Sequence, residues 1–161
     1  MPDLLGHLFI GLILAELFNA RKKSLIVLGA LAPDLLSKLD LIYFYFNIPK
    51  VIQFSSFHTP MMCFLISILI APLFRYGGIK TVISFNIGSV SHFLLDLVNK
   101  HFSRSGTRFL FPFSFHNYTL NLIWSDDTIF ILAAVILAYI ALIYLKKKRI
   151  INGFFYKNKI L

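Results

Sequence analysis

The hydrophobic residues of the chain fall into five long segments that short polar or charged stretches separate. The segments cover residues 4–18, 24–46, 60–74, 80–98 and 128–145. A helix needs about 20 apolar residues to cross the hydrocarbon core of a bilayer. The segments 4–18 and 60–74 are short of that length and could be tilted, partly interfacial or supported by neighbouring segments. Pro33 interrupts the second segment and is expected to kink it, because proline removes a backbone donor. The pattern predicts an all-α fold, a polytopic transmembrane helix bundle with about five membrane segments.

The composition agrees with a membrane protein. Of the 161 residues, 58% are hydrophobic and only 14% are charged, whereas a soluble domain has about 25% charged residues. We expect residues 1–161 to form a single integral membrane domain, with a core over 4–145 and a basic C-terminal tail over 146–161. The net charge of +9 could indicate nucleic-acid binding, but the Lys and Arg residues flank the apolar segments, as in membrane proteins. We therefore predict membrane lipids, and no nucleic acid, as partners.

The distribution of basic residues orients the chain, because cytoplasmic loops are enriched in Lys and Arg. If the N-terminus is outside and all five segments cross, eleven of the sixteen basic residues lie inside. This predicts a multi-pass protein with its N-terminus outside and its C-terminus in the cytoplasm. No Lys or Arg precedes Arg21, so we expect no secretory signal peptide.

Two ionisable residues, His92 and Asp96, lie in the apolar segment 80–98. Residues four apart share one face of a helix, so the two side chains point the same way. Ionisable groups at bilayer depth are expensive and indicate a functional site. A neutral imidazole and a carboxylate one turn apart can bind one cation, and the alternative is a hydrogen-bonded pair that fixes helix packing.

Three further residues fall in the same leaflet under this topology: His7, Asp34 and His58. Each has a simpler interpretation. His7 could be an interfacial histidine, Asp34 could cap a helix that restarts after Pro33, and His58 could face solvent in a loop. Thr59 and Pro60 read as the N-cap and first residue of a helix, which would fix the place of His58. A second group of polar residues is expected in loops or at a helix start: His101, His116, Asp126 and Asp127.

Taken in order, the motifs are similar to those of a known family. His7 and Gly11 in the first segment are followed by GALAPD (29–34), FHTP (57–60), SHFLLD (91–96) and GTRFLFPFS (106–114). Over roughly residues 4–114 the chain resembles the membrane-bound metal-dependent hydrolases of prokaryotic inner membranes, whose His/Asp site is likened to zinc-dependent phospholipase C-like enzymes. The resemblance implies the following metal ligands: His7, Asp34, His58, His92 and Asp96.

The chain departs from the family pattern at three positions. Leu36 stands where a second acidic residue is common, and Gln53 and Phe54 stand where a His-Arg pair is common. These differences predict either fewer bound metals or altered or lost catalysis.

The resemblance and the residues together predict a membrane-embedded hydrolase that depends on a divalent metal, Zn²⁺ being expected. The metal would activate a water, and Asp34 or Asp96 would act as the catalytic general base. The aromatic stretch 106–124 suggests a lipid entry surface, so a lipid or other membrane-associated ester or phosphoester is the expected substrate. The alternatives are a small transporter with a proton relay, and a structural or assembly protein with a buried polar His/Asp cluster.

Overall fold

The computed structural model describes residues 4–47, 49, 54–75, 77–98, 108–124 and 127–158. These ranges form helices joined by turns and contain no β-strand, which confirms the all-α prediction. The α-helices are α1 (Leu4–Leu17), α2 (Lys23–Ser37), α3 (Asp40–Tyr45), α4 (Pro60–Ile70), α5 (Gly78–Val98) and α6 (Thr128–Asn158). Two short 3₁₀ helices, η1 (Phe54–Phe57) and η2 (Ala71–Leu73), flank α4.

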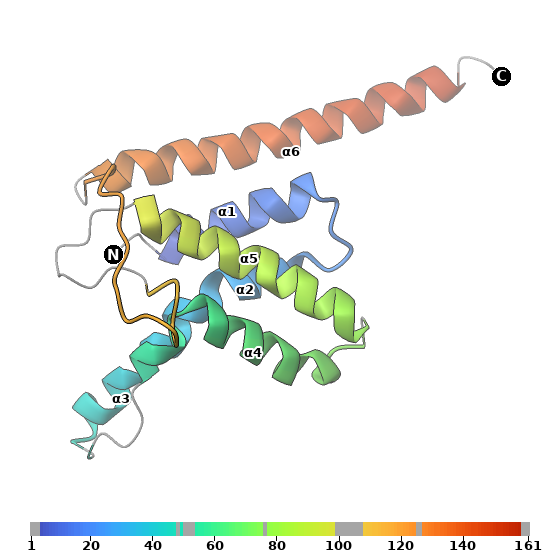
Figure 1. The fold of residues 1–161 in the computed structure, drawn as a ribbon. Helices are drawn as coiled ribbons and strands as arrows, with labels where there is room; N and C mark the ends of the chain where they lie inside the picture. Colours follow the sequence, from blue (N-terminus) through green and yellow to red (C-terminus); the bar gives the residue numbers. More distant parts are fainter. Residues whose placement is uncertain are drawn as a thin grey trace.

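The long helices run back and forth between the two ends of the molecule (Figure 1). Helices α1, α4 and α6 run in one direction, and α2 and α5 return in the other. Helix α5 packs on α1, α2 and α4, whereas α6 packs mainly on α1. The C-terminal end of α5 therefore meets the N-terminal end of α1 and the C-terminal part of α2 at one end of the bundle. This end carries the His and Asp residues singled out in the sequence.

Helices α2 and α5 cross at close range because two glycines face each other's backbones. A Cβ atom at Gly29 would collide with the carbonyl oxygen of Phe85, and one at Gly88 would collide with that of Ile26. Small residues at a crossing let membrane helices pack closely, which helps association where no hydrophobic effect is available. The crossing sets the positions of the α2 and α5 side chains one to two turns further along.

Pro33 lies inside α2, and the helix continues through it to Ser37. The proline cannot donate a hydrogen bond to the carbonyl of Gly29, four residues earlier. The hydroxyl of Ser89 in α5 donates to that carbonyl instead, at 3.1 Å. The segment 24–46 is interrupted, but the break lies at Lys38–Leu39, between α2 and α3, and not at Pro33. Because the helix does not restart after Pro33, the interpretation of Asp34 as a cap is wrong.

The starts of two helices agree with the sequence. Helix α4 begins at Pro60, and the Thr59 hydroxyl accepts a hydrogen bond from the backbone N–H of Met62, which confirms the N-cap. Helix α6 begins at Thr128, as predicted, but it continues to Asn158. The segment was expected to end at residue 145, where the basic run starts. Lys and Arg are good helix formers, so the basic run extends the helix rather than ending it.

In the described part of the chain, two helices are long and apolar enough to cross a membrane. These are Gly78–Val98 and Thr128–Arg149, with mean hydropathy of 1.4 and 2.7. Helix α1 has 14 residues and is therefore about 21 Å long, shorter than the ~30 Å hydrocarbon core. The apolar stretch Pro60–Leu73 is also short. The prediction of about five membrane-spanning segments is therefore not supported, because the first and third runs form short helices and the second divides into α2 and α3.

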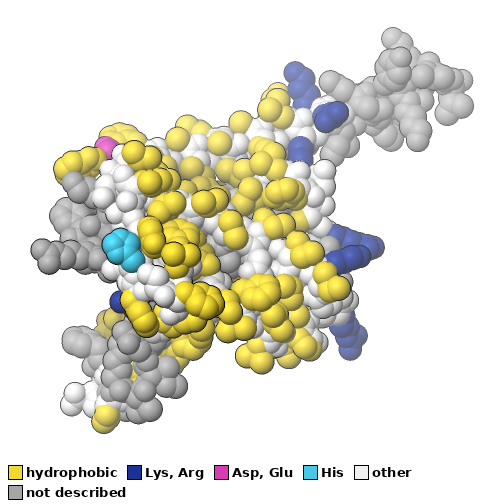
Figure 2. Space-filling view, viewed as in Figure 1, with side chains coloured by type: hydrophobic (Ala, Val, Ile, Leu, Met, Phe, Trp, Pro, Cys, Tyr) yellow, Lys and Arg dark blue, Asp and Glu magenta, His cyan; other side chains and the backbone are white. Residues whose placement is uncertain are grey.

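The end of the molecule opposite the His and Asp residues is basic (Figure 2). Lys and Arg side chains gather there from the α1–α2 connection, the start of α5 and the C-terminal part of α6. Buried Glu16 forms ion pairs with Lys23 and with Lys146, the latter at 3.1 Å. Lys146 also donates to the side-chain oxygen of Asn19 at 2.8 Å. These contacts hold the C-terminal part of α6 against the end of α1.

Candidate metal centre

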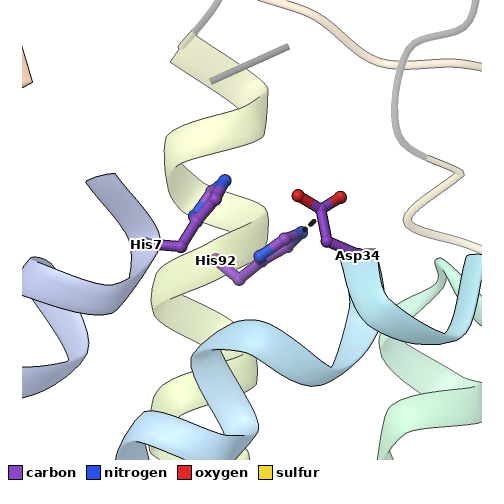
Figure 3. Close-up of side chains that lie close together, drawn as sticks. All are labelled: His7, Asp34 and His92. Atoms are coloured by element: carbon purple, nitrogen blue, oxygen red, sulfur yellow. Dashed lines mark ion pairs between the residues drawn. The ribbon is translucent and has the colours of Figure 1, made fainter. Parts of the chain in front are cut away.

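Five ionisable side chains from different parts of the chain meet at the end of the bundle opposite the basic residues. His7 comes from α1, Asp34 from α2, and His92 and Asp96 from α5, while His58 precedes α4. Four of the five are buried, and the side chain of His58 is 22% exposed. Figure 3 shows three of them: the rings of His7 and His92 lie side by side, and the carboxylate of Asp34 points toward His92.

His92 is fully buried, and the backbone of α2 fixes its orientation. Its Nδ1 lies 2.8 Å from the carbonyl oxygen of Ala30. A carbonyl only accepts hydrogen bonds, so Nδ1 carries the proton and donates it. In the neutral ring, Nε2 therefore keeps a lone pair. This Nε2 lies 2.9 Å from Nε2 of His58 and 3.2 Å from Oδ2 of Asp96.

His7 is buried with both ring nitrogens lacking a hydrogen-bond partner in the described structure. Its ring stacks on His92 with centroids 3.9 Å apart. Its Nε2 lies 3.5 Å from Oδ1 of Asp96, which is an ion-pair distance and longer than a good hydrogen bond. A buried polar group without a partner costs about 1–3 kcal/mol. The site therefore contains a donor atom that its own protein neighbours leave unsatisfied.

The two carboxylates differ in how closely the histidines approach them. Oδ2 of Asp96 lies 3.0 Å from His58 and 3.2 Å from His92, and Oδ1 faces His7. Oδ1 of Asp34 lies 3.5 Å from His58 and 3.9 Å from His92. Asp96 is thus at the centre of the cluster, and Asp34 lies at its edge.

The charge on His58 is stabilised by these carboxylates. Burial opposes its protonation, but contacts with Asp34 and Asp96 outweigh burial and raise the pKa of His58 to about 9. In the absence of another cation, a proton on His58 supplies the positive charge that two buried carboxylates need. A metal cation could supply the same charge in place of this proton.

The donor atoms form two overlapping sets that could hold a metal ion. His7, Asp34 and His92 form one set, and His58, His92 and Asp96 form the other, with the donor atoms of each set within 4.8 Å of one another. Imidazole nitrogens and carboxylate oxygens are ligands that Zn²⁺ and other divalent transition metals accept. The residues present therefore fit a divalent metal, and Nε2 of His7 faces Asp96 at 3.5 Å, beyond the distance of a good hydrogen bond.

A family model described as YdjM inner membrane protein matches residues 1–156. The chain belongs to this family. Membership supports an inner-membrane location, as the sequence predicted. The metal-dependent hydrolase part of the predicted resemblance is not confirmed, because the family description states a location and no reaction. No curated protein and no solved structure gives a significant match.

The remaining polar residues of the sequence prediction lie elsewhere. His116 is exposed and stacks edge-on against Tyr118, with centroids 5.0 Å apart. Asp127 is exposed directly before α6, where a carboxylate suits the helix dipole. His101 and Asp126 fall outside the described residues.

Two of the three positions that depart from the hydrolase pattern are visible. Leu36 packs against a buried hydrophobic cluster that consists of Ala32, Cys63, Phe85 and Phe93. The backbone N–H of Phe54 donates to Oδ1 of Asp40 at 2.9 Å, which ties η1 to the start of α3. Gln53 falls outside the described residues. At Leu36 and Phe54 the chain therefore uses the positions for packing and for joining elements.

The sequence interpretation missed two hydrogen bonds between α2 and α5, one to the site and one near it. The Ala30 carbonyl orients His92, and the Ser89 hydroxyl satisfies the carbonyl that Pro33 leaves free. The second could have been found, because a proline inside a membrane helix always frees the carbonyl four residues earlier, which then needs a donor. The contact of Ala30 depends on the helix crossing, and no local pattern indicates it.

Aromatic residues cover part of the cluster. The ring of Phe93 lies 5.4 Å from both His58 and His92, and Phe109 lies 6.3 Å from Phe93. The segment that contains Phe109 runs across the end of α5, where the N–H of Leu120 donates to the carbonyl of Leu97 at 2.7 Å. The part of the aromatic stretch that is described, 108–124, therefore lies beside the cluster.

Proposed function

We propose that this protein is a membrane-embedded hydrolase that uses one divalent metal ion, Zn²⁺, to cleave an ester or phosphoester of a lipid. The observation that carries the proposal is His7. Two unsatisfied nitrogens in a buried ring, stacked on a second histidine and facing a carboxylate, are costly for a protein that binds nothing there. A bound metal would give one of these nitrogens, Nε2 beside Asp96, a partner.

One ion is proposed because both possible ligand sets need the same atom. His92 offers only Nε2, since its Nδ1 donates to Ala30. The closest three donors are His58, His92 and Asp96, whose contacts are 2.9–3.2 Å. Two histidines and a carboxylate are a common ligand set of catalytic zinc sites, which keep a further position open. His7, next to Asp96, is the fourth ligand in this proposal.

The two carboxylates take different roles. A bound Zn²⁺ would lower the pKa of a coordinated water to near 7 and polarise the scissile group. Asp96 is the ligand, because its contacts with the histidines are the shorter ones. Asp34 makes the longer contacts and remains available as the general base that takes a proton from water. The Ala30 carbonyl keeps His92 in the tautomer that presents a lone pair.

A lipid substrate is proposed from the surroundings of the one ligand that reaches the surface. His58 is partly exposed and lies beside Phe93, and the aromatic segment 108–124 runs close by. Many of the aromatic and aliphatic side chains of that segment are exposed, Phe113 by 91% and Leu122 by 68%. An apolar approach to a polar site suits a molecule with an apolar body and a polar ester group.

The same proposal places the His/Asp end toward the outside and the basic end in the cytoplasm, in agreement with the positive-inside rule. The N-terminus is then outside and the C-terminus inside. Helices α1, α2 and α4 are too short to cross alone and lie within the membrane against α5, which crosses it.

The two non-catalytic alternatives, a transporter and a structural protein, predict different arrangements of the ionisable residues. A proton or ion path needs ionisable groups along the bundle, but the buried ones in the described residues are the cluster and Glu16, which Lys23 and Lys146 neutralise. A purely structural cluster needs its members to satisfy one another, and His7 is not satisfied. Both points favour the metal site.

Metal analysis of the purified full chain in detergent tests the proposal. We expect about one Zn²⁺ per chain, retained after His116→Ala and lost after His92→Ala. His116 is the matched control, because it is an exposed histidine outside the cluster. A folded wild-type chain that contains no stoichiometric metal would refute the metal site, and so would a His92→Ala variant that keeps the metal. Hydrolysis of a lipid ester by the wild type, absent in Asp34→Asn, then tests the reaction itself.

A further inference from the structure

An apolar groove runs along the surface between α1 and α5. Its volume is about 720 Å³, within the range of pockets that hold small molecules. Ile10, Leu14 and Phe18 line it from the α1 side, and a stripe that includes Ile83, Ile87 and Leu94 lines it from α5. The α5 stripe extends from residue 83 to residue 98, which corresponds to about 22 Å along the helix. The groove is therefore longer than one leaflet of a bilayer core, which is about 15 Å.

The polar groups in the groove are already engaged by the protein. The amide nitrogen of Asn86 donates to Ser67 Oγ and to the carbonyl of Val82, both at 2.8 Å. The hydroxyl of Ser91 donates to the carbonyl of Gly88 at 2.7 Å. The groove therefore suits an apolar occupant, because a polar one would lose its hydrogen bonds to water and gain few in return.

One end of the groove lies next to exposed basic residues. Lys80 is one turn before Ile83 and shares its face of α5, and Arg21 and Lys22 follow Phe18 in the α1–α2 connection. All three side chains are exposed, and no ion pair links them to a carboxylate in the described part of the chain. By contrast, neighbouring Lys23 is paired with Glu16. An apolar groove thus begins at a group of unpaired positive charges.

We propose that this groove binds an anionic phospholipid, with an acyl chain along α1 and α5 and the phosphate held by Arg21, Lys22 and Lys80. Basic residues at a membrane surface attract anionic headgroups, and the groove supplies the complementary apolar surface. From Lys80, one leaflet of about 15 Å reaches to Val90, which lines the groove. The phosphate end of the site is separate from the metal cluster, since Lys80 and His92 are about 18 Å apart along α5. It therefore does not depend on the proposed hydrolase activity.

A lipid fits this groove better than a second copy of the chain. Two copies inserted in the same orientation place their basic ends in the same plane, where like charges repel each other. A lipid phosphate at that end neutralises the charge instead. The charge next to the groove therefore selects an anionic occupant.

Native mass spectrometry of the full chain in detergent tests the proposal with two probes that share the same acyl chains. Phosphatidylglycerol is anionic, and phosphatidylcholine is zwitterionic. We expect the wild type to bind the first at least fivefold more tightly. Two variants with equal charge loss are compared: Lys22→Gln/Lys80→Gln beside the groove, and Lys147→Gln/Lys148→Gln on α6. The first should weaken phosphatidylglycerol binding about fivefold per lost charge, and the second should leave it unchanged.

A third variant tests the groove rather than the charge. Val90 is 54% exposed and lines the groove, so Val90→Trp should fill it with little effect on folding. Leu137→Trp on α6, 65% exposed and outside the groove, is its control. Equal binding of the two lipids to the wild type would overturn the proposal and requires no variant. Equal weakening by both charge variants, undiminished binding to Val90→Trp, or a dimer that Val90→Trp dissociates would also overturn it.

Discussion

Nδ1 of His92 lies 2.8 Å from the carbonyl oxygen of Ala30, so the backbone of α2 sets the tautomer of the central histidine on α5. The other nitrogen, Nε2, is then directed at His58 and Asp96. This relation between two helices depends on how closely they approach each other. The geometry of the cluster is therefore linked to the small residues at the crossing, one turn away along α5.

Gly88, at the crossing of α2 and α5, is expected to be essential for the site. Gly88→Ala would place a Cβ against the carbonyl of Ile26, so the helices must separate, at a cost of about 1–3 kcal/mol. His92 would then lose the Ala30 carbonyl. We expect a lower thermal unfolding midpoint in detergent and a loss of bound zinc.

Gly6→Ala on α1 is the control for that variant, because no atom lies within 4 Å of the added Cβ. It should leave both the unfolding midpoint and the zinc content unchanged. If Gly88→Ala behaved like Gly6→Ala, the close crossing would not be what positions His92.

Ser89 and Pro33 are expected to be coupled. Ser89→Ala leaves the Gly29 carbonyl without a donor and should reduce the free energy of unfolding by about 1–3 kcal/mol. In a Pro33→Ala background the new backbone N–H can donate to Gly29, so the same change should then cost much less. A double-mutant cycle measured by unfolding in detergent gives this interaction energy. Additive effects of the two substitutions would show that Ser89 does not replace the missing donor.

Much of the fold could be predicted, because the apolar runs and the residues that start a helix are local features of the sequence. Thr59-Pro60 marks the start of α4, and the apolar run from residue 128 marks that of α6. The number of spanning helices could not be predicted, because apolar composition does not reveal that the 24–46 segment divides near Lys38. Short buried helices and membrane-spanning helices are built from the same apolar residue types.

The approach of five scattered residues followed from an alternating topology, which places His7, Asp34 and His92 at the same end of the first, second and fourth segments. Their mutual distances did not follow from it. Those depend on the Gly29–Gly88 crossing and on the Ala30 carbonyl, which are tertiary contacts without a sequence signature of their own. The role of the cluster as a metal centre stays a prediction.

The two carboxylates of the cluster should separate metal binding from catalysis. Asp96→Asn removes the carboxylate that lies within 3.2 Å of both His58 and His92, so zinc content should fall several-fold. Asp34→Asn alters a carboxylate with longer contacts and should retain zinc while losing about 10²–10⁴-fold in hydrolysis rate. Metal analysis and a lipid-ester assay on the same preparations measure both effects. The assignment is reversed if Asp34→Asn loses the metal and Asp96→Asn keeps it.

The attachment of α6 is expected to depend on Lys146. Its ammonium group contacts Glu16 and Asn19, and the only ring contact between α6 and α1 in the described structure is Phe9–Tyr139, with centroids 5.8 Å apart. Lys146→Gln should therefore loosen the C-terminal part of α6 while Glu16 stays paired with Lys23. Hydrogen–deuterium exchange tests this, because Lys146→Gln should raise the exchange rate of the α6 backbone amides around residue 146. Lys147→Gln, an exposed neighbour, should not change that rate, and an equal effect of both lysines would indicate general charge loss rather than the Glu16 contact.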